Sequence, residues 1–131
     1  MDYYLSELKL FHDERGYVKH GLKFTDENSF GIREVYFSNV KNGFYKGWKK
    51  HKEMILNLIV INGEIVFYLA NNDFSKIINF SISHKDAKRL TVMPNQWLAF
   101  TSATKPSSTL INISNLMNNE DIVDNKPFFL P

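Results

Sequence analysis

The stretch that decides the fold is residues 43–70, which read GFYKGWKKHKEMILNLIVINGEIVFYLA. Its first half mixes lysines and His51 with aromatic residues, and its second half is two apolar runs, Ile55–Ile61 and Ile65–Leu69, separated by Asn62-Gly63. Asn and Gly both tolerate a positive φ, so this pair predicts a tight hairpin between two strands. The stretch therefore predicts a cationic strand that leads into a buried hairpin, and the hairpin would wall a pocket for His51.

Composition limits the class of protein. A chain of 131 residues with 44% apolar and 15% aromatic residues is expected to form one folded domain. It has no apolar run long enough for a membrane span and no cysteine for a disulfide scaffold or a thiol nucleophile. The N-terminus lacks the layout of a signal peptide, which favours the cytoplasm. A net charge of +2 argues against a nucleic-acid partner.

The rest of the chain reads as short strands separated by turn residues. About nine or ten strands at this spacing, without a long amphipathic helix, predict an all-β sandwich or barrel. The tail from Asn118 is acidic and predicts an extended or docked terminus. Beside the central stretch, the predicted strands lie at 1–11, Tyr17–Phe24, Arg33–Val40, Ile77–Ile82, Leu90–Met93, Trp97–Thr101 and Thr109–Ile113.

The spacing around His51 resembles the first motif of the cupins, Gly-x5-His-x-His-x3–4-Glu-x6-Gly. Gly43, His51 and Gly63 stand at the positions of the two glycines and the second histidine. Lys49 replaces the first histidine and Leu56 replaces the glutamate. The resemblance implies a single-domain cupin jelly roll over residues 1–131.

The second cupin motif begins Pro-x-Gly and continues to a histidine. Pro94 is present here, but Ala99 stands at the histidine position. His51 is then the only metal-ligand position retained, whereas a transition metal needs about three protein ligands. The resemblance therefore implies a cupin with no metal and no cofactor.

Two subfamilies of metal-free, RmlC-like cupins act on nucleotide-linked sugars, and the chain resembles both. The dTDP-4-dehydrorhamnose 3,5-epimerases carry Asp-x-Arg-Gly-aromatic, Arg-Gly-Leu-His and Ile-Pro-x-Gly-Phe, which match Asp13–Tyr17, Lys46–Lys49 and Met93–Trp97. The dTDP-sugar 3,4-ketoisomerases carry Arg-Val-Tyr-Tyr and Arg-Gly-Gly-His-Ala-His-Lys, which match Arg33–Tyr36 and Lys46–Lys52. The resemblance implies a homodimer that acts on a dTDP-4-keto-6-deoxyhexose in the synthesis of bacterial surface polysaccharide.

Three residues are the predicted catalytic groups. His51 has the near-neutral pKa that a base beside a sugar ketone needs. Lys49 lies two residues away, on the same face of a strand, and could stabilise an enolate oxygen. Tyr36 could donate a proton from the opposite side. Strand alternation turns Lys50 and Lys52 to the other face.

Five further residues are predicted to bind substrate. Arg33 and Lys46 are expected at the diphosphate, and Trp48 and Trp97 could stack on sugar or base. Arg15 corresponds to a nucleotide-binding residue of the epimerases, a role that only the resemblance implies.

Three functions remain open at this point. The first is a nucleotide-sugar 3,4-ketoisomerase or 3,5-epimerase that works by metal-free proton transfer. The second is a non-catalytic nucleotide- or sugar-binding cupin, which the replacement of the first histidine by Lys49 favours. The third is a partner subunit of another sugar-modifying enzyme.

Overall fold

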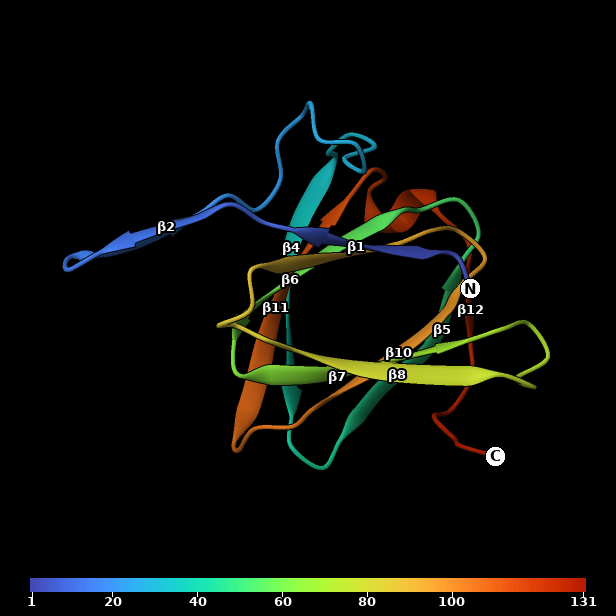
Figure 1. The fold of residues 1–131 in the computed structure, drawn as a ribbon. Helices are drawn as coiled ribbons and strands as arrows, with labels where there is room; N and C mark the ends of the chain where they lie inside the picture. The colour runs from blue at the N-terminus through green and yellow to red at the C-terminus, as the bar shows by residue number, and fades with distance from the viewer.

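The computed structural model describes residues 1–131 and has two five-stranded antiparallel sheets that face each other (Figure 1). In spatial order, the first sheet consists of β1 (Tyr3–Glu7), β9 (Lys88–Val92), β6 (Leu56–Asn62), β11 (Ser107–Ser114) and β4 (Glu34–Lys41). The second consists of β12 (Val123–Asn125), β5 (Tyr45–His51), β10 (Trp97–Ser102), β7 (Glu64–Ala70) and β8 (Ile77–Ser83). A separate hairpin, β2 (Leu10–Asp13) and β3 (Gly16–Lys19), projects from this body (Figure 1). The predicted all-β jelly roll is confirmed.

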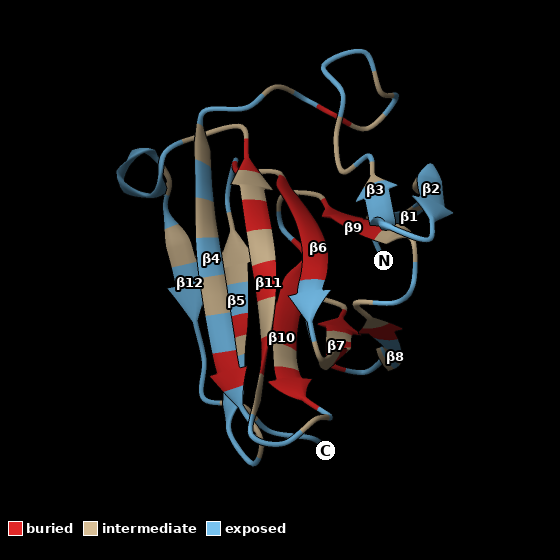
Figure 2. Ribbon diagram, turned by 90° about the vertical axis from the view of Figure 1, so that its left-hand side faces the viewer, coloured by how far each residue is buried: buried red, intermediate tan, exposed pale blue.

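The main core lies between the two sheets. Ile65, Phe67 and Leu69 alternate along β7 and are fully buried, because successive side chains of a strand point to opposite faces. Inward-facing residues of β6 and β11 pack against them from the other sheet, where Figure 2 shows buried and less buried bands alternating along β11. The inner faces of the sheets thus supply both the core and the walls of any pocket between them.

The predicted hairpin at Asn62-Gly63 is wrong. β6 pairs with β9 and β11, whereas β7 pairs with β8 and β10, so the chain passes from one sheet to the other at this point. Gly63 does have the positive φ of +79° that the sequence indicates. The turn nevertheless makes a corner, because the two apolar runs bury their side chains by facing each other across the core rather than by lying side by side.

Two other expectations are refined by the structure. The predicted strand at Tyr17–Phe24 ends at Lys19, within the projecting hairpin. The tail is docked, as one of the two predicted forms: a short 3₁₀ helix, η1 (Asn118–Glu120), leads into β12, which pairs with β5. The structure contains no helix of the length and apolarity needed to cross a membrane.

Candidate active site

A cavity of about 500 Å³ opens between the inner faces of the two sheets. β5 contributes Lys46, Lys49 and His51 to its wall, while β4 and β11 contribute Tyr36 and Asn112 from the opposing sheet. The C-terminal segment covers part of it with Asn118, Asn119, Val123 and Asn125. Apolar side chains line its floor, among them Leu56, Leu58, Leu98 and Leu110. The cavity therefore brings together all three predicted catalytic residues.

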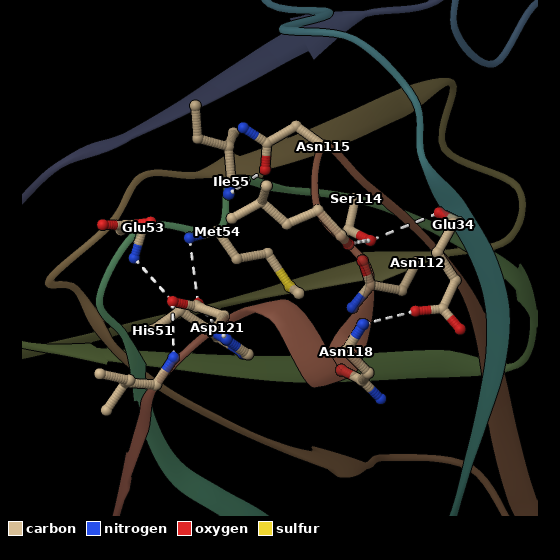
Figure 3. A network of polar contacts seen from close by, with 12 residues as sticks. Glu34, His51, Glu53, Met54, Ile55, Asn112, Ser114, Asn115, Asn118 and Asp121 are labelled. Atoms are coloured by element: carbon tan, nitrogen blue, oxygen red, sulfur yellow. Dashed lines mark hydrogen bonds and ion pairs between the residues drawn. The ribbon is translucent and has the colours of Figure 1, made fainter.

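His51 is paired with a carboxylate from the tail. Its Nδ1 lies 3.2 Å from Oδ2 of Asp121, whose side chain is only 1% exposed (Figure 3). Asp121 is held in turn by three backbone N–H groups, which Glu53, Met54 and Ile122 donate at 3.0, 3.0 and 2.8 Å. An ionised Asp121 accepts a hydrogen bond from Nδ1–H of His51, so this pair leaves Nε2 of His51 as the unprotonated nitrogen.

The surroundings keep His51 neutral and Asp121 charged. Burial lowers the pKa of His51, the carboxylate of Asp121 opposes this shift, and the Lys49 charge adds to it. Burial alone would raise the pKa of Asp121, but its backbone hydrogen bonds and His51 together hold that pKa below its usual range. At neutral pH the pair is thus a neutral imidazole oriented by a carboxylate, which is the form a general base needs.

A bulge in β5 brings two lysines to the cavity. Leu98 of β10 pairs with Lys49, but Phe100 pairs with Lys46, so Gly47 and Trp48 together face Ala99. This extra residue reverses the alternation, and Lys46 points to the same side as Lys49. Gly47 allows it with a φ of +112° and by bringing its backbone within van der Waals reach of β10.

Tyr36 and Asn112 form a polar pair on the other wall. They are direct cross-strand partners of β4 and β11, and Nδ2 of Asn112 donates to the Tyr36 hydroxyl at 2.7 Å. Burial raises the pKa of Tyr36, and the charge of Glu34 raises it further. The phenol therefore stays protonated at neutral pH and can donate into the cavity.

The two tryptophans, which the sequence predicts to stack on sugar or base, are not among the residues that line the cavity. Trp48 and Trp97 are 0% and 3% exposed and pack with Phe74 in a second apolar cluster on the other face of β5 and β10. Phe128 stacks on Trp48, and the Trp48 indole donates to the carbonyl of Phe129. They anchor the tail that carries Asp121.

The two predicted arginines are also outside the cavity. Arg33 lies just before β4, where its Nε is 3.4 Å from Glu120 of η1. Arg15 lies in the turn of the projecting hairpin, where it pairs with Asp13 at 2.7 Å, and its side chain is 86% exposed. Neither arginine is among the residues that line this cavity. Lys50 lies on the opposite face from His51, as predicted, with its Nζ 5.0 Å from the ring centre of Trp97.

The sequence did not reveal two residues of the candidate site, Asn112 in the cavity wall and Asp121 behind His51. Asn112 lies between Ile111 and Ile113 in β11, and its inward position follows from β alternation once the register is known. Asp121 is 70 residues from His51 and belongs to no spaced motif. The acidic tail was the only available signal for it. No group of three or more His, Cys, Asp or Glu side chains with metal-binding geometry occurs in the structure.

Comparison with models of protein families identifies the family of this chain. The model of the FdtA family, described as WxcM-like, C-terminal, matches residues 1–130. The chain belongs to the FdtA family. No curated protein matches it significantly.

Solved structures of sugar isomerases share the fold of this FdtA-family chain. A dTDP-sugar isomerase from Desulfovibrio desulfuricans G20 is 22% identical, with a TM-score of 0.82 over 95% of this chain and 83% of the other. A 3,4-ketoisomerase from Helicobacter canadensis is 24% identical, with a TM-score of 0.78 over 93% and 90% of the two chains. QdtA, a sugar 3,4-ketoisomerase from Thermoanaerobacterium thermosaccharolyticum solved with TDP, is 19% identical, with a TM-score of 0.79 over 91% and 84%. The predicted RmlC-like cupin is confirmed.

Proposed function

We propose that this FdtA-family chain is a nucleotide-sugar isomerase of the 3,4-ketoisomerase type that acts on a dTDP-4-keto-6-deoxyhexose. The observation that carries the proposal is the His51–Asp121 pair in a cavity whose opposite wall holds a protonated Tyr36. A base facing an acid across one pocket is what proton transfer next to a ketone requires. The family match and the isomerases with the same fold support the same reaction class.

The chemistry is a proton transfer with no net oxidation. Nε2 of His51 removes the proton from C3, and the C3–H electron pair forms an enediolate with the C4 ketone. Lys49 and the hydroxyl of Tyr36 stabilise the oxygen that becomes negative. The proton returns to C4, a proton passes from O3 to O4, and the carbonyl ends at C3. Asp121 stabilises the imidazolium while His51 holds the proton.

Lys46 is the proposed contact for the diphosphate. It lines the cavity from the start of β5 and pairs with no carboxylate in the structure. A free ammonium near a pocket is an effective point charge for a phosphate. Arg33 would have to leave Glu120 before it could assist.

Binding and exchange together test this function. We expect dTDP to bind more tightly than UDP in calorimetric titration, and dTDP-4-keto-6-deoxyglucose to exchange its C3 proton with deuterated water by NMR. His51→Ala should abolish exchange, and Lys49→Ala should slow it. The exposed Lys52, which does not line the cavity, supplies the matched control Lys52→Ala. Binding without exchange would favour a non-catalytic nucleotide- or sugar-binding cupin, and absence of binding to either nucleotide would refute the proposal.

We further propose that the chain forms a homodimer through the projecting hairpin. Phe11, Tyr17 and Val18 on this hairpin are 60%, 64% and 61% exposed. Exposed apolar groups gathered on a projecting element are typical of an interface. Light scattering that measures a monomer at micromolar concentration would refute the dimer.

A further inference from the structure

One buried side-chain polar atom in the molecule has no partner, and it belongs to a residue that lines the candidate active site. Oδ1 of Asn112 makes no hydrogen bond, and no other buried side-chain nitrogen or oxygen lacks one. Asn112 is 6% exposed and lines the cavity (Figure 3). A buried acceptor without a donor is costly, and native proteins retain few of them. A hydrogen-bond donor on a bound ligand would remove the cost of this unpaired acceptor.

The neighbours of Asn112 do not supply that donor. Its polar neighbours along the inner face of β11 are both satisfied: Ser108 bonds to Ser102 and Glu64, and Ser114 donates to the carbonyl of Leu116. Leu58, its partner on β6, is apolar. The rest of β11 thus follows the rule that buried polar groups are paired, and Asn112 alone departs from it.

Tyr36 completes the pattern. Its hydroxyl oxygen accepts from Nδ2 of Asn112, and its own hydrogen is directed to no acceptor in the protein. The pair therefore presents one free donor, the Tyr36 O–H, beside one free acceptor, Oδ1 of Asn112. The complementary ligand carries an acceptor oxygen and a donor hydroxyl on two adjacent carbons. A ketone next to a carbon that bears a hydroxyl has this pattern.

We propose that Asn112 is a specificity-determining residue that accepts a hydrogen bond from the hydroxyl on the sugar carbon adjacent to the C4 oxygen. Tyr36 then donates to the C4 oxygen itself. This inference rests on the proposed function and deepens it, because it makes an intact hydroxyl next to C4 a condition of binding. A site built to bond a hydroxyl rejects the analogue that lacks it, since the buried acceptor is then left unpaired.

The test compares two unreactive ligands that differ by that hydroxyl, dTDP-6-deoxyglucose and dTDP-3,6-dideoxyglucose, with dTDP alone as the reference. We expect calorimetry to give the wild-type chain roughly 10- to 100-fold tighter binding of the hydroxyl ligand. Asn112→Leu, which keeps the branched shape of the side chain but removes the acceptor, should bring the two affinities within about twofold of each other. Asn112→Asp keeps an acceptor and should keep the preference.

The controls separate the possible failures. dTDP should bind wild type and Asn112→Leu equally, because the proposal puts the sugar and not the nucleotide at Asn112. If the wild-type chain does not bind dTDP, the proposed function itself is refuted. Normal dTDP binding with an unchanged preference in Asn112→Leu would refute only the role of Asn112.

Discussion

Replacing Asp121 by Asn tests whether the tail carboxylate sets the working form of His51. In the wild type, Oδ1 of Asp121 accepts from Glu53 and Ile122, and Oδ2 accepts from Met54 and His51. An amide keeps one acceptor oxygen and puts an NH₂ where Oδ2 was. That NH₂ then faces two groups that were donors.

The two donors respond differently. The backbone N–H of Met54 cannot change and loses its partner. His51 can move its proton from Nδ1 to Nε2, so that Nδ1 accepts from the new amide, but Nε2 then carries the hydrogen and cannot act as the base. We expect exchange at C3 to fall about 10³-fold, in the range that loss of a correctly oriented base costs.

Stability should fall in the same variant. The substitution removes the charge that four donors share and leaves one buried N–H unpaired, which together cost about 3 kcal/mol. For a domain of this size the melting temperature should drop by roughly 10 °C.

The assay measures both quantities and includes a control from the same segment. Exchange is followed by NMR at 15 °C, well below the expected melting of the variant, and unfolding is followed by circular dichroism. Asp124→Asn is the matched control, because Asp124 lies three residues further on, is 65% exposed and contacts only Lys50 at 3.9 Å. Asp124→Asn should change neither quantity noticeably. Exchange in Asp121→Asn within threefold of wild type would refute the assigned role of Asp121.

Two more changes follow from the same geometry. The pKa of His51 is lowered in the folded state, so the unfolded chain takes up this proton first as the pH falls. The free energy of unfolding should therefore be highest above about pH 6.5 and decline below it. The acid limb of the pH–rate profile should likewise lie below pH 6.5. Lys49→Met should move that limb to higher pH by removing a charge that lowers the pKa, and an unmoved limb would contradict the assignment. Gly47→Ala should cost about 3 kcal/mol in urea unfolding, because the new Cβ would lie 2.6 Å from the Leu98 carbonyl oxygen at a φ of +112°. Gly31→Ala, with a φ of +88° but open space, should cost only about 1 kcal/mol, and equal losses in the two would mean that contact with β10 is unimportant.

The positions of most strands could be predicted because the alternation of apolar and polar residues is a local signal. β4, β8, β10 and β11 lie within a few residues of their predicted bounds, since each has one buried and one more exposed face or a short apolar run. The corner at Gly63 was beyond reach for a physical reason. A positive φ permits either a hairpin or a turn between sheets. The choice depends on which strands pair with β6 and β7, and the local sequence does not contain that information.

Within the site, the cluster of Lys49 and His51 on β5 could be predicted. The residues that complete it from other segments could not. Lys49 and His51 share a face by simple alternation, as expected. Lys46 reaches that face only through the bulge at Gly47, and alternation alone would have put it on the other side. Asp121 and Asn112 reach the site through pairings of β12 with β5 and of β11 with β4, which join parts of the chain far apart in sequence.

The tail ties these observations together, because one segment both closes the cavity and completes the base. Its far end is held on the outer face of β5 by Phe128 against Trp48 and by the bond from Trp48 to Phe129. Pairing of β12 with β5 then fixes the residue opposite His51 at Val123, two positions from Asp121. Trp48 therefore acts on the site from the face opposite the cavity: its burial positions the C-terminal segment that carries Asp121. A tryptophan predicted to touch the ligand contributes instead by holding the group that orients the base, and losing its side chain should slow exchange while leaving the cavity wall itself intact.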